Sequence, residues 1–161
     1  MVGVVVDNTV LSNFALAGRD DVLRNTFGDA ICATDEVMLE LAAGVAKELV
    51  PRLDWSWLPV LRMESTEERN TFEVMCERLG RGEASCLSLA ISRNFRALTD
   101  DRDARMIAHR RNIAVSGTMG ALVFAVKRGV LTLEGANALL ALMIEKGYYA
   151  PFQKLDDLIG Y

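Results

Sequence analysis

Acidic side chains follow predicted strands of this chain at the places where a parallel sheet would bring them together. Asp7 comes directly after the apolar run 2–6, and Asp100 and Asp101 come directly after the run 95–99. Because ligands of doubly wound sheets bind beyond the carboxyl ends of the strands, these carboxylates would face a common crevice. Carboxylates that converge repel one another, and a cation relieves that repulsion.

Further acids are placed where helices would carry them to the same crevice. Asp103 lies in the first turn of the next predicted helix, and Glu83 opens a helix after a break at residues 80–82. Glu40 lies one turn beyond Glu36 on one face of another helix. Hard oxygen ligands suit Mg²⁺ or Mn²⁺, and such an ion can clamp a phosphate and lower the pKa of bound water. The pattern therefore predicts a metal site for phosphodiester hydrolysis.

Most of these acids also have a purely structural interpretation. Either Asp100 or Asp101 could be a helix N-cap, and Glu83 could stabilise a helix N-terminus by about 0.3–1 kcal/mol. Glu36 and Glu40 could be surface residues, and this interpretation suits Glu36 better. A carboxylate directly after a buried valine run has no comparable structural explanation, so the first acid favours function.

Arginine is concentrated in one segment of an otherwise acidic chain. The 161 residues carry a net charge of −4, yet residues 78–111 hold eight arginines against four acids. This segment is therefore +4 and the remainder −8. A solvated helix face would explain the segment, but the planar arginine fork also binds phosphate well. A basic zone beside a set of acids is what a phosphodiester enzyme needs.

The composition excludes several classes of protein. With 51% hydrophobic residues and 3 prolines, the chain is neither disordered nor collagenous. Its three cysteines form no CxxC pair and predict buried thiols of a reducing compartment. The chain has one histidine, His109, which argues against a His-rich metal site or a Ser-His-Asp triad. No apolar stretch approaches about 20 residues and no signal-peptide pattern opens the chain, so we expect a cytoplasmic protein.

Hydrophobic periodicity predicts an alternation of strands and helices along the chain. Strands are expected at residues 2–6, 30–33, 58–62, 95–99 and 113–115. Helices are expected at residues 10–16, 20–27 and 35–46, after a capping box at 65–68, and at 83–94, 102–111 and 118–127. A last long helix is expected between its cap, Thr132, and Gly147, which ends it. This order predicts a single α/β domain over residues 1–161, with a mostly parallel sheet covered on both faces. We expect the tail, residues 148–161, to pack back on the domain.

Four segments resemble the motifs of the PIN-domain family. The first is Val-Val-Val-Asp7-Asn-Thr9-Val-Leu-Ser12-Asn13-Phe, and the second is Glu-Val-Met-Leu-Glu40-Leu. The third is Leu79-Gly-Arg-Gly-Glu83-Ala-Ser-Cys-Leu-Ser-Leu-Ala90, and the fourth is Leu98-Thr-Asp-Asp101-Arg-Asp-Ala-Arg105. The third resembles one branch in which a Gly-Glu pair replaces the more usual aspartate. Two further segments, Val115-Ser-Gly-Thr118 and Lys127-Arg-Gly129, also fit that branch of small stand-alone bacterial and archaeal proteins. The similarity covers residues 2–150.

The resemblance implies a three-layer α/β/α sandwich with a central, mostly parallel sheet and a Mg²⁺ or Mn²⁺ site. It assigns the role of catalytic, metal-binding acid to Asp7, Glu40, Glu83 and Asp101. Asp100 and Asp103 would support the metal, and Thr9 and Thr118 would orient the metal or its water. The fourth motif offers two adjacent aspartates as the ligand. We expect the RNA strand to be positioned by Arg81, Arg102 and Arg105.

The leading functional hypothesis is therefore a metal-dependent ribonuclease directed at single-stranded or structured RNA. Many relatives with these motifs are toxins of toxin–antitoxin pairs, so the resemblance also implies a homodimer and an antitoxin partner. One alternative is a PIN-like module that binds nucleic acid or protein without cutting. Another is a phosphotransfer or receiver-like protein in which Asp7 accepts phosphate, although the motif match disfavours it.

Overall fold

The valines after Gly3 form a strand that is buried on both faces, as in parallel sheets. In the computed structural model, which describes residues 2–159, this strand is the centre of a five-stranded sheet. The strands are β1 (Val4–Val6), β2 (Ile31–Thr34), β3 (Val60–Leu61), β4 (Arg96–Leu98) and β5 (Val115–Ser116). The helices are α1 (Asn8–Leu16), α2 (Asp20–Phe27), α3 (Asp35–Ala46), α4 (Thr66–Met75), α5 (Arg81–Arg93), α6 (Arg102–Arg110), α7 (Thr118–Lys127) and α8 (Leu133–Glu145). Short 3₁₀ turns lie at Gly28–Ala30 and Asp156–Leu158.

All strand pairs are parallel, and the strand order is β3-β2-β1-β4-β5. The chain therefore adds β2 and then β3 on one side of β1. It then crosses back and adds β4 and β5 on the other side. β1 and β4 are paired with Val6 opposite Leu98, so both strands end at the same level. The point at which strand order reverses is where ligand crevices open in sheets of this kind.

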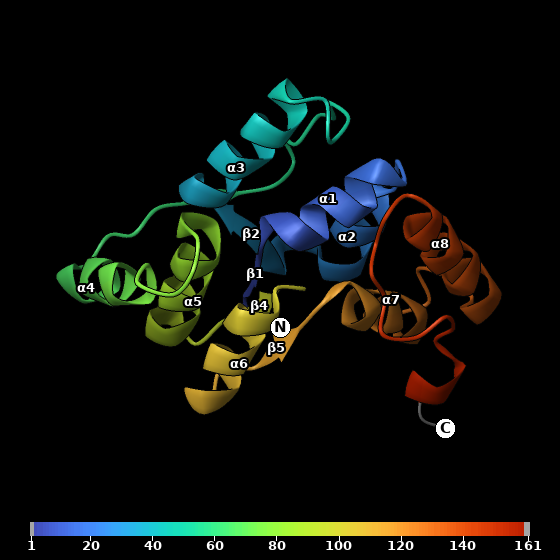
Figure 1. The fold of residues 1–161 in the computed structure, drawn as a ribbon. Helices are drawn as coiled ribbons and strands as arrows, with labels where there is room; N and C mark the ends of the chain where they lie inside the picture. Colours follow the sequence, from blue (N-terminus) through green and yellow to red (C-terminus); the bar gives the residue numbers. More distant parts are fainter. Residues whose placement is uncertain (1, 160–161) are drawn as a thin grey trace.

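Helices cover both faces of the sheet, which confirms the expected three-layer arrangement (Figure 1). Helices α1, α2, α7 and α8 pack together on one face, and α4, α5 and α6 pack on the other. Helix α3 contacts both α1 and α5, so it lies across the carboxyl edge of the sheet. No helix in residues 2–159 is long and apolar enough to cross a membrane.

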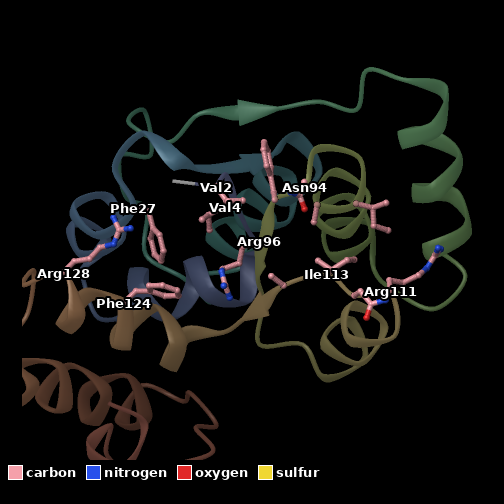
Figure 2. Close-up of a pocket in the computed structure, with 14 residues that line it drawn as sticks. Val2, Val4, Phe27, Asn94, Arg96, Arg111, Ile113, Phe124 and Arg128 are labelled. Atoms are coloured by element: carbon pink, nitrogen blue, oxygen red, sulfur yellow. The ribbon is translucent and has the colours of Figure 1, made fainter. Parts of the chain in front are cut away.

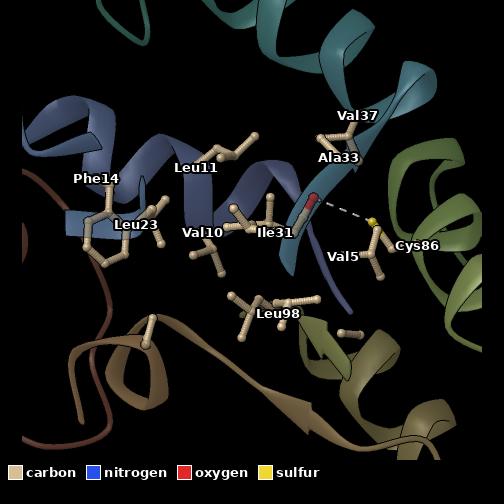
Figure 3. Close-up of a cluster of buried hydrophobic side chains, with 14 of the residues drawn as sticks. Val5, Val10, Leu11, Phe14, Leu23, Ile31, Ala33, Val37, Cys86 and Leu98 are labelled. Carbon is tan, nitrogen blue, oxygen red and sulfur yellow. Dashed lines mark hydrogen bonds between the residues drawn. The ribbon is translucent and has the colours of Figure 1, made fainter. Parts of the chain in front are cut away.

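The core lies between β1 and the helices on either side (Figure 3). Val5, Leu11, Ile31 and Leu98 are fully buried there. Cys86 belongs to the same cluster, and its thiol donates to the carbonyl of Val6 at 3.7 Å. Burial raises the pKa of this thiol well above its ordinary value. It is thus a core residue, as the sequence indicates.

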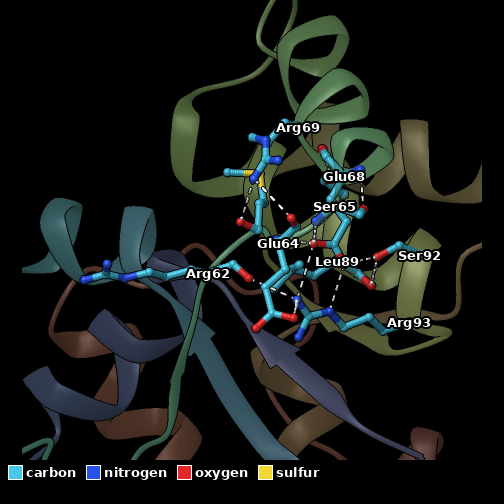
Figure 4. A network of polar contacts seen from close by, with 10 residues as sticks. Arg62, Glu64, Ser65, Glu68, Arg69, Leu89, Ser92 and Arg93 are labelled. Carbon is cyan, nitrogen blue, oxygen red and sulfur yellow. Dashed lines mark hydrogen bonds and ion pairs between the residues drawn. The ribbon is translucent and has the colours of Figure 1, made fainter.

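The Glu68 carboxylate joins α4 to α5 within the helical layer that these two helices form with α6 (Figure 4). Glu68 closes the predicted capping box with Ser65 and accepts hydrogen bonds from Arg93 Nε at 2.9 Å and Ser92 Oγ at 2.7 Å. The Arg93 guanidinium holds the pKa of Glu68 down at about 2, despite its burial. Ser88 Oγ donates to the Glu68 carbonyl at 2.6 Å. These contacts hold α5 in place, and α5 carries Glu83.

Several predicted boundaries differ from the structure, and two of these differences have identifiable reasons. Helix α5 begins at Arg81 rather than Glu83, because Gly80 is its N-cap and Gly82 lies within its first turn. Strand β5 begins at Val115 rather than residue 113, because Ile113 N donates to Ala108 O at 2.8 Å and so completes the end of α6.

The tail returns to the domain over residues 148–159, whereas 160 and 161 lie outside the described residues. Leu155 is fully buried, and its N–H donates to Asn137 Oδ1 of α8 at 2.8 Å. The Asn137 amide in turn donates to Asp156 at 2.9 Å. The tail is therefore anchored by one apolar side chain and two hydrogen bonds.

Candidate metal centre

Three carboxylates meet at the carboxyl edge of the sheet, beside the point where strand order reverses. Asp7 follows β1, Glu40 projects from α3, and Glu83 lies in the first turn of α5. One oxygen of each lies within 4.8 Å of one oxygen of the other two. Because these acids come from three elements far apart in sequence, the convergence is a product of the fold.

Asp7 is the buried member of this group, with no exposed surface. Its Oδ2 accepts hydrogen bonds from Thr9 Oγ1 and Thr99 Oγ1, each at 2.9 Å. Its Oδ1 is buried and has no hydrogen-bond partner among the described residues. Burial raises the pKa of Asp7 to about 6, against the lowering effect of the two threonine hydroxyls, and the charge of Glu40 raises it further.

Glu83 shares the electrostatic environment of Asp7. Its pKa rises to about 7, first because it is half-buried and then because the charges of Asp7, Glu40 and Asp101 repel its own. Two neighbouring carboxyl groups with raised pKa values indicate a site that would be stabilised by positive charge.

Gly82 allows Glu40 to reach this group. The Gly82 N–H donates to Glu40 Oε1 at 2.9 Å. A side chain at position 82 would overlap the Glu40 carboxylate, since a Cβ there would meet all three of its terminal atoms. The glycine is therefore required for the close approach, and its place inside α5 explains why a sequence break was expected at this point.

The remaining predicted acids lie outside the group of three. Asp101 is the N-cap of α6, and its Oδ1 accepts from Ala104 N at 2.7 Å, so it adopts the N-cap role that the sequence left open. It still lies near enough to raise the pKa of Glu83 by its charge. Asp103 is exposed in the first turn of α6.

The Asp100 side chain is held by residues of α1 and α7, which lie on the other face of the sheet from α5. Its carboxylate accepts from Thr118 N at 2.8 Å, from Thr118 Oγ1 at 2.5 Å and from Asn13 Nδ2 at 3.1 Å. Its backbone N–H donates to Thr9 Oγ1 at 3.0 Å. Thr9 thus orients Asp7, whereas Thr118 orients Asp100. The first aspartate of the pair is bound by residues of α1 and α7, whereas the second caps α6.

Sequence reasoning missed two residues that shape the site. Thr99 donates to Asp7 and also accepts the N–H of Asp101 at 3.2 Å. Its position at the end of β4, directly before the two aspartates, was the available signal. Asn13 lies one turn beyond Thr9 on the same face of α1, and this spacing could have identified it.

The predicted nucleic-acid contacts are basic residues at the same edge. Arg81 is exposed and forms a bidentate pair with Glu36, at 3.1 and 2.8 Å, while its guanidinium lies over the Phe72 ring. Glu36 is therefore a partner of arginine rather than a free surface residue. Arg102 is exposed at the start of α6, and Arg105 Nη1 donates to Thr99 O at 3.2 Å.

The donor set fits a hard divalent cation. It offers carboxylate oxygens, a buried Asp7 oxygen without a partner among the described residues, and carboxyl groups whose pKa values are raised first by burial and then by neighbouring negative charge. Mg²⁺ and Mn²⁺ take such oxygen ligands. Helices α1, α3, α6 and α7 each begin just after a strand, so their positive N-terminal ends also lie at this edge. That arrangement suits an anionic substrate beside a cation.

A cavity of about 480 Å³ lies at the opposite edge of the sheet (Figure 2). Val4 and Arg96, the first residues of β1 and β4, line it together with Phe27 and Phe124. The Arg96 guanidinium lies over the Phe124 ring at 5.4 Å. None of its lining residues is acidic, so it is separate from the carboxylate group in position and in chemistry.

Comparison with known proteins agrees with the fold described above. A family model described as a PIN domain matches residues 3–159. Among solved structures, the crystal structure of PAE2754 from Pyrobaculum aerophilum has a similar fold, with a TM-score of 0.55 and 20% identity over 81% of this chain and 91% of that one. No curated protein matches the chain. The family match spans nearly the whole sequence, and the chain therefore belongs to the PIN-domain family.

Proposed function

We propose that the protein is a Mg²⁺- or Mn²⁺-dependent endoribonuclease. The observation that carries the proposal is the group formed by Asp7, Glu40 and Glu83, in which one oxygen of each lies within 4.8 Å of one oxygen of the other two. Asp7 also has a buried oxygen, Oδ1, without a hydrogen-bond partner among the described residues. A module that only binds RNA has no use for negative charge at the place where phosphate docks. The membership of the family supports a nuclease, since PIN domains commonly are nucleases.

Each residue of the site would have a distinct task. Asp7, Glu40 and Glu83 would hold the ion, and Asp101 would add charge beside Glu83. Thr9 and Thr99 hold Asp7 Oδ2, which leaves Oδ1 without a hydrogen-bond partner among the described residues. The bound ion supplies Lewis-acid activation of the phosphate and of the attacking water.

Asp100, Asp103 and the predicted arginines would act around this centre. Asp100 joins α1 to α7 through Asn13 and Thr118, and it would thereby fix the walls of the crevice. Arg102 and Arg105 would bind the phosphates of the strand. Arg81 would contribute if its pairing with Glu36 opened towards the substrate.

The test is cleavage of a mixture of single-stranded and structured RNA by the purified protein. Reactions contain Mg²⁺, Mn²⁺ or EDTA, with Asp7→Asn as the inactive variant and Asp29→Asn, an exposed position, as its matched control. We expect metal-dependent cleavage that Asp7→Asn loses and Asp29→Asn keeps. A folded protein that binds Mn²⁺ and RNA yet cuts nothing would instead favour a binding module.

We further propose that the protein acts in the cytoplasm as the toxin of a toxin–antitoxin pair and forms a homodimer. The resemblance of its motifs to those of small stand-alone PIN proteins supports this part of the proposal. Expression of the wild-type chain should then arrest growth, and Asp7→Asn should not. Light scattering of the purified protein would measure its mass, and a monomer at micromolar concentration would exclude the dimer.

A further inference from the structure

The cavity at the amino edge of the sheet combines positive charge with aromatic surface, and the proposed metal centre makes no use of it (Figure 2). Its volume of about 480 Å³ lies within the range of about 300–1,000 Å³ that is usual for pockets holding small molecules. We call it the amino-edge pocket and define it by the three arginines and three phenylalanines that line it: Arg96, Arg111, Arg128, Phe27, Phe95 and Phe124.

The pocket is lined by cations and, in the described part of the chain, by no acid. Figure 2 shows Arg111 and Arg128 on opposite sides of the pocket, with Arg96 between them. Within residues 2–159, neither Arg96, which is half-buried, nor Arg111 forms an ion pair with a carboxylate. By contrast, Arg93 is also half-buried and is paired with Glu68 at 2.9 Å. A cation partly withdrawn from water without a carboxylate partner favours an anionic ligand.

The Arg96 guanidinium is held in position in this pocket. It lies over the Phe124 ring at 5.4 Å, and its Nη1 donates to Ser116 Oγ of β5 at 3.0 Å. The Phe124 ring is itself in edge-to-face contact with Phe27, with ring centroids 5.8 Å apart. Because a guanidinium carries five N–H donors, one hydrogen bond to a serine leaves further donors for a ligand.

These arginines could instead neutralise the negative ends of helices, since α2, α5, α6 and α7 end at this edge. Three of the helices are closed by the backbone, because an N–H beyond the helix donates to a carbonyl of its last turn. The pairs are Phe95 N with Ala90 O, Ile113 N with Ala108 O and Val130 N with Ala125 O. At the end of α2, Arg128 Nη1 donates to Thr26 O at 3.0 Å. In the described residues the side chains of Arg96 and Arg111 donate to no helix carbonyl, so this role accounts for Arg128 alone.

The remaining wall of the pocket is apolar and suits a flat organic group. Phe95 packs directly against the backbone before β1, since a Cβ at Gly3 would meet three atoms of its ring. Val4 and Ile113, which also line the pocket, are buried. Aromatic rings beside a fixed guanidinium form a site for a ligand that carries both a ring and a negative charge.

We propose that the amino-edge pocket binds a small organic anion that carries a flat ring. Its phosphate or carboxylate would lie at Arg96, and its ring would pack against the phenylalanines. The proposal goes beyond the proposed nuclease function and does not rest on it. The pocket lies where β1 and β4 begin, whereas the acids lie where these strands end.

The first test measures the affinity of the protein in EDTA for four probes by isothermal titration calorimetry. 1-Naphthyl phosphate and 1-naphthoate carry a ring and an anion, 1-naphthol carries the ring alone, and inorganic phosphate is the anion alone. We expect one of the two ring anions to bind in a 1:1 ratio, at least tenfold more tightly than 1-naphthol and inorganic phosphate. The tighter of the two identifies the anionic group as a phosphate or a carboxylate. Absence of binding by both ring anions, or equal affinity for 1-naphthol, would overturn the proposal.

The second test locates the bound anion. Arg96→Gln should weaken binding of the tighter ring anion at least tenfold, because it removes charge-assisted hydrogen bonds. Arg111→Gln alters an exposed side chain, so it keeps the test decisive if Arg96→Gln fails to fold, and it should weaken binding about threefold. Arg78→Gln, at an exposed position outside the pocket, is the matched control and should leave the affinity unchanged.

Asp7→Asn separates this pocket from the metal centre. In EDTA this variant should bind the ring anion like the wild type, because the two sites lie at opposite edges of the sheet. An affinity that changes in Asp7→Asn but not in Arg96→Gln or Arg111→Gln would place the anion at the acids and overturn the proposal. An equal loss in Arg78→Gln and Arg111→Gln would also overturn it, since binding would then follow net charge rather than the pocket.

Discussion

Replacing Asp7 with asparagine should stabilise the metal-free protein, although the position is fully buried. The asparagine oxygen can still accept the hydrogen bonds from Thr9 and Thr99. Its NH₂ group takes the place of Oδ1, which has no partner and lies in a group of carboxylates. The substitution therefore removes a buried charge, keeps the hydrogen bonds and adds a donor where acceptors are close.

The magnitude follows from the pKa of Asp7, which is raised from 3.8 to about 6 in the folded protein. At about 1.4 kcal/mol per pKa unit, the ionised carboxylate destabilises the folded state by about 3 kcal/mol at pH 8. The folded state binds the proton more tightly than the unfolded chain, so this penalty is complete above pH 6. It shrinks as the pH falls from 6 to 3.8 and is absent below that value. Loss of this charge also relieves Glu83, whose pKa the Asp7 charge raises.

The assay is urea unfolding in EDTA at pH 8, 6.5 and 5, followed by the fluorescence of Trp55 and Trp57. We expect Asp7→Asn to gain about 2–3 kcal/mol at pH 8 and about half as much at pH 5. Asp29→Asn, the exposed control, should stay within about 0.5 kcal/mol of wild type at every pH. Saturating Mn²⁺ should stabilise the wild type and not the variant. A variant that is less stable at pH 8, or a gain that does not change with pH, would refute the buried-charge explanation.

Three further outcomes are expected. Gly82→Ala should weaken Mn²⁺ binding at least tenfold, because its Cβ would displace the Glu40 carboxylate. The free energy of unfolding in urea should stay unchanged or rise by about 0.5–1 kcal/mol. Unchanged Mn²⁺ affinity would contradict the close contact between Gly82 and Glu40. Mn²⁺ binding near pH 6.5 should release protons and weaken at lower pH, because the pKa of Glu83 is about 7, and calorimetry in two buffers would detect this. Glu68→Gln should lower stability by about 2 kcal/mol at pH 7. That loss should fade as the pH falls from 4.5 towards 2, because the folded pKa of Glu68 is depressed from 4.5 to about 2; a pH-independent loss would contradict it.

Most elements of the fold could be predicted because their signals are local. Helix α3 starts and ends where the sequence predicts, since Thr34 Oγ1 accepts from Val37 N and caps it. Helix α2 also has its predicted bounds, and Gly28, with a φ of +55°, follows it directly. These features depend on neighbours a few residues away, and the sequence displays them directly.

The start of α5 differs from its prediction because of a contact between distant residues. Nothing near Gly82 shows that a glutamate 42 positions earlier in the chain needs the space its side chain would fill. Propensity therefore predicts a break, whereas the tertiary contact places this glycine inside a helix. The different roles of Asp100 and Asp101 also depend on distant residues. Thr118 and Asn13, which belong to the helices on the other face of the sheet, bind the Asp100 carboxylate.

The candidate site follows from strand order more than from any single motif. Asp7 and the pair after β4 become neighbours because the chain reverses its direction of sheet growth between β1 and β4. A motif predicts that acids are present, but topology decides which of them meet. Two of the acids that meet have raised pKa values, because burial and, to a smaller extent, the neighbouring carboxylates disfavour their ionised forms. Such an arrangement lowers stability in the absence of a cation, and a cation that relieves it would be bound all the more tightly. The destabilised carboxyl groups and the proposed metal affinity are thus two consequences of one geometry, and a single substitution at Asp7 should alter both in opposite directions.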